Sequence, residues 1–423
     1  MHFSHTPGTH TGYSRYGTKL EAAVQGLGYR TTPLAPGVTP EGVAVWVTTP
    51  NHARGWYDGQ WKVLSTMWET MSLPEGFREG LHNFEQLVVP SAHNLELFQS
   101  FHENVYQVPL GVDGWEWRPR PRRPPTNRFV FLVCGNGARK GVDLAVKAFQ
   151  KLFNGGSLYP RPVLQIKSAS PVDAPLGTGI QHISGFLSDS EEQELYAQAH
   201  CFLAPSRGEG FGLQPLQAIA SGLPTVLTDA HGHAGFARLG WPIPAGRSKA
   251  DYFLHGDGGE WWEPDLDALC GRMEQIYRSY DVAAKQAADS AEIAHQLFSW
   301  ARCAEAFVDS FAEHLDQPYG GKGEWQTPEL KRYPVRLSRF WACSVAGADY
   351  QFYPGVDYYE TADVKRILFE QNLLDPSCVD PAHPDATGLT EAQLARLGEY
   401  TASRSYCHAC GQILNSGVRY DHP

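Results

Sequence analysis

The sequence lacks any stretch of about 20 consecutive apolar residues, the length that a helix needs to cross the hydrocarbon core of a bilayer. Its N-terminus also lacks the basic segment followed by an apolar one that is typical of a secretory leader. These two absences predict a soluble protein of the cytosol with no membrane span.

Cysteine and positive charge are both scarce. Eight cysteines, spread from Cys134 to Cys410, are too few in 423 residues for a disulfide scaffold, so most are expected to be buried thiols. The chain has 35 basic residues against 46 acidic ones and a formal net charge of -11, which excludes a general attraction to nucleic acid. A local basic patch stays compatible with these counts.

What the sequence does contain is a regular alternation of short apolar runs and helical patterns. This alternation is typical of parallel sheets covered on both faces, and the length of the chain predicts two or three domains. The expected strands are 42–47, 61–64, 86–89, 129–134, 162–167, 201–204 and 225–228. The expected helices are one ending before Gly28, then 92–101, 142–153, 190–199 and 213–221, with mostly helical sequence over 264–315.

The domain boundary is expected at residues 118–125, where four prolines and four arginines exclude a regular helix or a central strand. This segment is interpreted as a stiff, solvated linker, with a patch for an anionic ligand as the alternative. Two sheets in tandem then give a two-lobed α/β protein with a cleft. The expected parts are an N-terminal lobe over 1–118, a second lobe over 126–300, a helix crossing back over 301–318, and an accessory domain over 325–423.

A first glycine-rich loop, Gly135-Asn-Gly-Ala-Arg-Lys-Gly141, follows a strand and leads into a helix. Amides at a helix start carry partial positive charge, and glycines let a phosphate approach them. Arg139 and Lys140 add full positive charges. A diphosphate is the natural ligand for this combination.

A second segment, from Ala204 to Gly222, has the same order of strand end, glycine loop and helix. Its loop contains Glu209, and Gln217 lies eight positions later in the helix. Both loops should lie at the carboxyl ends of neighbouring parallel strands, where open α/β sheets bind ligands. A carboxylate and an amide placed in this way can hold hydroxyl groups on either side of a diphosphate.

The stretch from about 129 to 307 resembles the donor domain of family-four glycosyltransferases, whose GT-B fold has two Rossmann-like domains facing a cleft. The motifs that carry the resemblance are Arg139-Lys-Gly141, Pro205-Ser-Arg-Gly-Glu-Gly-Phe-Gly-Leu213 and Ser221-Gly-Leu-Pro-Thr-Val226. The family pattern has two glutamates eight positions apart. Here the first is Glu209, and Gln217 replaces the second.

The resemblance implies transfer of a hexose from a UDP-, GDP- or ADP-sugar with retention of configuration and without a catalytic metal. Glu209 would contact the donor sugar, Gln217 the ribose, and Arg139 and Lys140 the diphosphate. Further residues expected at the donor site are Gly12, Tyr13, Lys167, Ser206, Gly210, Phe211, Gly212 and Leu213.

Several histidines are further candidates. His52 lies in a loop expected to face the cleft, where family members often have a histidine near the reacting carbon, and we count it as catalytic. His231 and His233 follow a strand and are expected either to contact sugar or base or to lie in a solvated glycine loop.

The C-terminal part contains Cys407-His-Ala-Cys-Gly411, which forms half of a typical structural zinc site. The predicted ligands are Cys378, His383, Cys407 and Cys410, with Cys343, His408 and His422 as other completions. Free or redox-active thiols are the alternative.

The acceptor cannot be read from these motifs: a glycan, a protein side chain and a modified nucleobase all stay open, and so does the oligomeric state. A phosphorylase or an epimerase of the same fold is disfavoured, because the cofactor-binding lysine context and the acid placement that they need are not seen. The alternative from another class is a catalytically idle module that binds sugar or nucleic acid, since the second glutamate is missing.

Overall fold

The computed structural model describes residues 1–5, 12–34, 41–49, 61–120, 122, 124–153, 158–169, 177–250 and 258–315, together with the backbone of six short strands between 335 and 415. The chain divides into two units, Met1–Gly320 and Gly321–Pro423. The first unit contains two lobes, each built on a six-stranded sheet. This is the α/β architecture predicted from the alternating sequence pattern.

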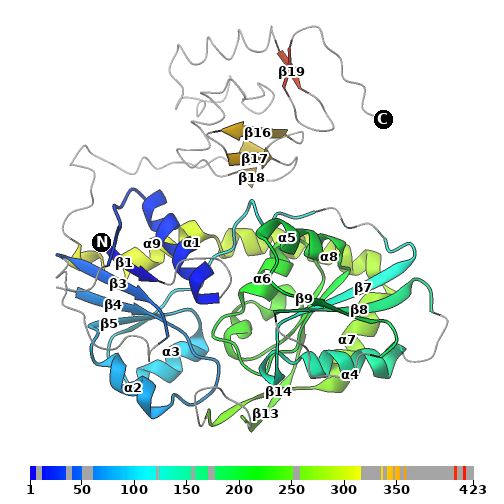
Figure 1. The fold of residues 1–423 in the computed structure, drawn as a ribbon, viewed down its shortest axis with the longest axis horizontal. Helices are drawn as coiled ribbons and strands as arrows, with labels where there is room; N and C mark the ends of the chain where they lie inside the picture. The colour runs from blue at the N-terminus through cyan, green and yellow to red at the C-terminus, as the bar shows by residue number, and fades with distance from the viewer. Residues whose placement is uncertain are drawn as a thin grey trace. The chain divides into compact units, whose positions relative to one another are not determined.

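The first lobe is a parallel sheet in the order β2-β1-β3-β4-β5-β6. Its strands are β1 His2–His5, β2 Thr32–Pro33, β3 Val43–Val47, β4 Trp61–Ser65, β5 Gln86–Val89 and β6 Val105–Gln107. Its helices are α1 Gly12–Gly26, α2 Glu75–Leu81 and α3 Ala92–Gln99. All of β3 is buried, because helices cover both faces of the sheet (Figure 1).

The second lobe is a parallel sheet in the order β12-β11-β10-β7-β8-β9. Its strands are β7 Arg128–Cys134, β8 Arg161–Ser168, β9 Ile180–Ser184, β10 Cys201–Ala204, β11 Thr225–Thr228 and β12 Trp241–Ile243. Its helices are α4 Val142–Phe153, α5 Asp189–Gln198, α6 Leu213–Ala220, α7 Leu266–Arg278 and α8 Tyr280–Leu297. The strand order reverses between β7 and β10, and such a switch point is where open α/β sheets bind ligands.

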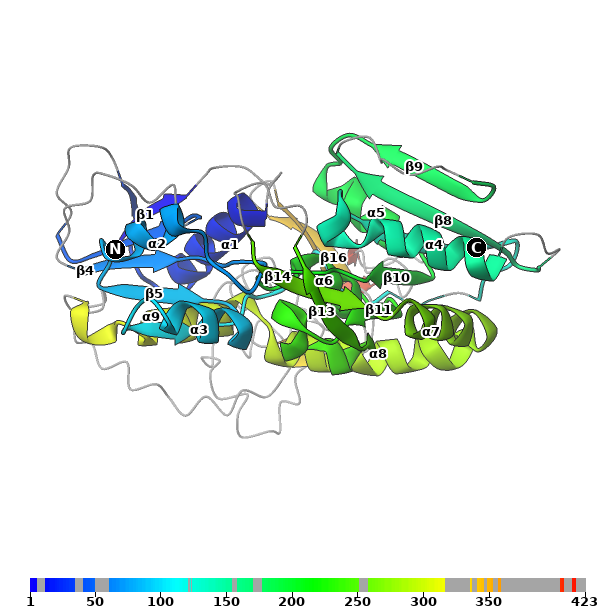
Figure 2. The ribbon, with the colours of Figure 1, turned by 90° about the horizontal axis from the view of Figure 1, so that it is seen from below.

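An antiparallel hairpin, β13 Ala245–Lys249 and β14 Glu260–Pro264, extends from the second lobe toward the first. Figures 1 and 2 both place it at the boundary between the lobes. The amide of Met71 in the first lobe donates a hydrogen bond of 2.9 Å to the carbonyl of Glu260. The hairpin therefore joins the two lobes directly.

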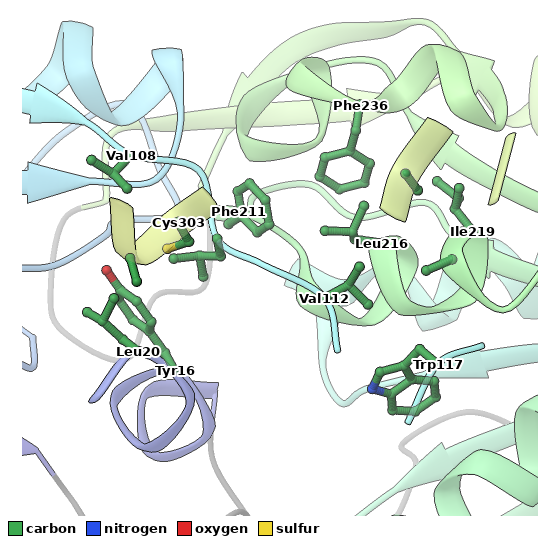
Figure 3. Packing of buried hydrophobic residues seen from close by; sticks show 14 of the residues in the cluster. Tyr16, Leu20, Val108, Val112, Trp117, Phe211, Leu216, Ile219, Phe236 and Cys303 are labelled. Carbon is green, nitrogen blue, oxygen red and sulfur yellow. The ribbon is translucent and has the colours of Figure 1, made fainter. Parts of the chain in front are cut away.

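The helix α9, Trp300–Asp309, returns from the second lobe and packs on α1 of the first. Before it, the amide of Val112 donates a hydrogen bond of 2.6 Å to the carbonyl of Phe298. Figure 3 shows the shared core around this crossing, where Val112 lies among side chains of both lobes, including Tyr16 and Leu216. One apolar cluster thus spans the boundary between the lobes.

The structure corrects our interpretation of residues 118–125 as a solvated linker at one position, Arg122. The guanidinium of Arg122 is enclosed, and it donates hydrogen bonds to the carbonyls of Tyr196 at 2.7 Å and Ser221 at 2.9 Å. It also reaches the carbonyls of Ala197, Ala199 and Gly222. These carbonyls end α5 and α6, where a cation is favourable. Burial lowers the pKa of Arg122 to about 10, so the side chain still carries its charge at neutral pH.

Replacing Arg122 with methionine is expected to lower the free energy of unfolding by about 3 kcal/mol, because several helix-end carbonyls lose a charged donor together. Urea denaturation followed by circular dichroism measures this. The matched control is Arg120→Met, since Arg120 pairs with Glu194 at 3.4 Å on the surface, where loss of a pair costs less than about 1 kcal/mol. Equal losses in both variants would contradict the capping role.

Two further expectations concern cysteines and metal. Cys134, Cys201, Cys270 and Cys303 are buried free thiols, which agrees with the prediction for these four of the eight cysteines. The expected zinc ligands Cys378, His383, Cys407 and Cys410 lie outside the described residues, and within the described ranges no cluster of acidic, cysteine and histidine side chains could hold a metal. The described helices include none that could cross a membrane.

Candidate functional site

The first glycine-rich loop connects β7 to α4, as predicted, and contains a short 3-10 turn, η2 Ala138–Lys140. Gly141 ends this turn with a φ of +67°, and a Cβ at this position would lie only 1.8 Å from the carbonyl oxygen of Pro205. Glycine is therefore required here for two reasons, its left-handed backbone and the close approach of the second loop. The two glycine-rich loops pack directly against each other.

The second loop follows β10 and presents Glu209 to both cations of the first loop. The Nζ of Lys140 lies 2.6 Å from one carboxylate oxygen of Glu209, and a guanidinium nitrogen of Arg139 lies 3.2 Å from the other. Burial alone would raise the pKa of Glu209, but Lys140 and Arg139 hold it well below its ordinary value. Glu209 is therefore an ionised carboxylate that neutralises part of the positive charge of the loop.

A cavity of about 410 Å³ lies over these loops at the switch point between β7 and β10. The predicted site residues that line it are Gly12, Tyr13, Arg139, Lys140, Lys167, Glu209, Gly210, Phe211, Gly212, Leu213 and Gln217. Ser206 is buried beneath the loop and does not belong to this lining. His52 lies outside the described residues. The structure thus gathers residues of three sequence motifs around one cavity.

The side chain of Gln217 is 4% exposed and lines the cavity from α6. The oxygen of its side-chain amide is buried and has no hydrogen-bond partner among the described residues. A buried amide oxygen without a partner is costly, so a ligand hydroxyl or amine that donates to it would be favoured.

The first lobe forms the opposite wall of the cavity. Gly12 and Tyr13 are the first two residues of α1. Tyr13 donates from its hydroxyl to the carbonyl of Met67 at 2.9 Å, and burial raises its pKa, so it stays protonated. The helix thus presents Tyr13 in a fixed position toward the second lobe.

Arg15 and Glu69 also line the cavity, although our sequence interpretation did not include them. Arg15 lies 2.8 Å from Glu192 of α5, which makes an ion pair between the lobes. Glu69 lies between two fully buried residues, Trp68 and Thr70, and its charge interacts with Arg139 and Tyr13. Sequence spacing did not identify either residue, because each lines the cavity only where the first lobe packs against the second.

Two polar side chains at the start of α3 hold the second loop from the first lobe. The Ser91 hydroxyl donates to the carbonyl of Gly210 at 2.7 Å, and the Asn94 amide donates to the same oxygen at 3.3 Å. Ser91 is also the N-cap of α3. The conformation of the second loop therefore depends on contacts across the lobe boundary.

His231 and His233 do not lie in a solvated loop, which corrects one of the two expectations. Both are buried in a 3-10 helix, η3 His231–Gly235, behind the second loop and outside the cavity lining. The Nε2 of His231 donates to the carbonyl of Ser206 at 2.9 Å. Burial lowers the pKa of His233 to about 4, so both rings are neutral at pH 7.

Acid is therefore expected to destabilise the fold through His233. The unfolded chain takes up a proton near the ordinary pKa of 6.5, and the folded chain only near 4. Stability is full above the first value and falls as the pH drops between the two. Urea midpoints between pH 7.5 and pH 4 measure this, and His233→Asn should flatten the decline. An unchanged pH dependence in that variant would show that His233 does not contribute.

Two parallel α/β lobes that line one cavity define the class of the protein as a GT-B glycosyltransferase fold. A model of the family described as "Family 4 Glycosyltransferase in conflict systems" matches residues 92–307, just over half of the chain. The chain belongs to this family. The resemblance inferred from the motifs is thereby confirmed.

Relatives agree with this assignment. The chain is 33% identical over 153 residues to an MMP alpha-(1->4)-mannosyltransferase of Mycolicibacterium hassiacum, covering 34% of this chain and 37% of the relative. It is 25% identical over 305 residues to a D-inositol 3-phosphate glycosyltransferase of Nocardia farcinica, covering 64% of this chain and 62% of the relative. The chain thus spans less than two thirds of the length of either relative.

A solved structure supports the fold. The Anabaena protein HepE, in complex with UDP and glucose, is similar with a TM-score of 0.53 and 11% identity, over 74% of this chain and 98% of that one. At this identity the likeness concerns the fold alone.

Proposed function

We propose that the protein transfers a hexose from a nucleoside diphosphate sugar to an acceptor hydroxyl with retention of configuration. The observation that carries this proposal is the cluster of Glu209, Arg139 and Lys140 in a cavity at the switch point of the second sheet. Two cations beside helix starts form a site for a diphosphate, and a carboxylate beside them can hold sugar hydroxyls.

The proposed chemistry uses this charge arrangement. As the bond between the sugar carbon and the phosphate oxygen breaks, positive charge develops on the sugar ring and negative charge on the departing diphosphate. Arg139, Lys140 and the amides at the start of α6 would stabilise the departing oxygens. In a retaining reaction, the acceptor oxygen bonds to the sugar carbon on the face that the phosphate leaves, and the departing phosphate oxygen takes the proton of the acceptor hydroxyl.

The remaining donor contacts follow from the position of Gln217. Its unpartnered amide would bind the ribose hydroxyls, because an amide can both accept and donate hydrogen bonds. Lys167, at the end of β8, lines the same cavity while its Nζ donates to the carbonyl of Gly185 at 2.6 Å. The acceptor would enter along the wall formed by Tyr13 and Glu69, and a glycan, a protein or a modified nucleobase stays open as acceptor.

The test is release of nucleoside diphosphate from a panel of UDP-, GDP- and ADP-sugars, with and without cell extract as a source of acceptors. Mannose donors have priority, since one relative is described as a mannosyltransferase. We expect release from one donor and stimulation by an extract. If the protein binds nucleotide but releases no diphosphate from any donor, the alternative of an idle binding module is favoured. The replacement of the second glutamate by Gln217 is the observation that supports this alternative.

A further inference from the structure

Arg207 belongs to the second loop but does not line the cavity. Arg207 is 6% exposed, and each of the five N–H groups of its guanidinium has an acceptor. Asp143 accepts at 2.7 and 3.0 Å, Glu263 accepts at 2.5 and 2.9 Å, and the carbonyl of Ala138 accepts at 2.6 Å. Both carboxylates are therefore bound in a bidentate manner, the geometry that a planar guanidinium favours.

The acceptors of Arg207 belong to three different elements. Ala138 begins the η2 turn that carries both cavity cations, Asp143 lies in the first turn of α4, and Glu263 lies in β14. The backbone adds a further contact, since the amide of Arg207 donates to the carbonyl of Arg139 at 2.7 Å. The η2 turn is thus held at both its first and its second residue by Arg207.

The charge of Arg207 is already compensated. One guanidinium lies between the carboxylates of Asp143 and Glu263, so this cluster has no positive charge left for a ligand. A direct attraction of Arg207 to a diphosphate is therefore small. What Arg207 controls is the place of Arg139 and Lys140.

We propose that Arg207 is a positioning residue that fixes the η2 turn so that Arg139 and Lys140 meet the diphosphate of the donor together. The role rests on the proposed donor site. Cations that are fixed before the ligand arrives need no reorganisation when charge develops on the leaving group. A turn released from Arg207 would place the two cations variably, and a shift of about 1 Å can cost roughly 100-fold in rate.

The experiment measures dissociation constants of the full chain for UDP, GDP and ADP, and then for the nucleoside of the diphosphate that binds. Arg207→Lys keeps the charge but cannot bridge two carboxylates and a carbonyl. We expect it to weaken nucleoside diphosphate binding roughly 10- to 100-fold and to leave nucleoside binding unchanged. Glu263→Gln removes one bidentate partner and should give a smaller loss of the same kind, so the test does not depend on one variant.

The matched control is Arg122→Met, which removes another enclosed arginine of the same lobe that touches no cavity residue. It should lower Tm and leave the ratio of diphosphate to nucleoside affinity unchanged, when all variants are measured well below their Tm. Equal loss of diphosphate and nucleoside affinity in Arg207→Lys, or wild-type affinity for the diphosphate, overturns the positioning role alone. Wild-type protein that binds none of the three diphosphates overturns the proposed function and, with it, the role of Arg207.

Discussion

Replacing Lys140 with alanine is expected to weaken nucleoside diphosphate binding roughly 100-fold and to remove turnover to a similar degree. The Nζ of Lys140 lies 2.6 Å from Glu209, and Arg139 is 3.2 Å from the same carboxylate. Without Lys140, Glu209 keeps its charge with a single cation, and the site loses the excess of positive charge that a diphosphate needs. Isothermal titration with UDP, GDP and ADP measures the affinity, and release of diphosphate from the donor measures turnover.

The matched control for this variant is Lys151→Ala. Lys151 belongs to α4, the helix that follows the cavity loop. Its Nζ pairs with Asp267 on the surface at 2.6 Å. Surface pairs contribute little to stability, and Lys151 does not line the cavity. The affinity of Lys151→Ala for the nucleoside diphosphate should therefore equal that of the wild type. If both lysine variants bound the diphosphate as tightly as the wild type, the two-cation site would be refuted.

Replacing Glu209 with glutamine is expected to separate binding from turnover. Removal of the negative charge frees Arg139 and Lys140 for the phosphates, and affinity for the nucleoside diphosphate should rise roughly tenfold. Turnover should fall by roughly 100-fold or more, because the carboxylate that would bind the donor sugar is lost from the site of charge development. Opposite signs for binding and turnover distinguish Glu209 from Lys140, whose loss lowers both.

The pH profile provides a second reading of the same residue. Burial alone would raise the pKa of Glu209, but Lys140 and Arg139 depress it below the ordinary 4.5, so the carboxylate stays ionised throughout the neutral range. Its contribution to stability is present above pH 4.5 and is lost as the pH falls through the lower folded-state value. Titration of the diphosphate affinity of the wild type should therefore show no step from Glu209 between pH 6 and pH 8. Weaker diphosphate binding by Glu209→Gln than by the wild type would contradict the competition between carboxylate and ligand.

Much of the second lobe was predictable because its signals are local. The bounds of β10, β11 and α4 agree with the sequence prediction, since each is an apolar run or a periodic pattern with a glycine or proline next to one of its ends. β1 was not predicted, because His-Phe-Ser-His is short and polar and becomes a strand only by pairing with β2 and β3. The helical sequence predicted over 264–315 begins with α7, whose N-cap is Asp265.

The sequence by itself determined the two glycine-rich loops, Glu209 and the cations Arg139 and Lys140, because these residues lie within short motifs that follow strands. Only the tertiary structure decided the roles of Arg122 and Arg207, whose acceptors lie more than fifty positions away in the chain. It also decided that His231 and His233 are buried and that Glu69 faces the cavity. The physical reason is that a motif fixes local backbone and charge, whereas the partner of a buried polar group is chosen by packing between elements that the sequence keeps apart.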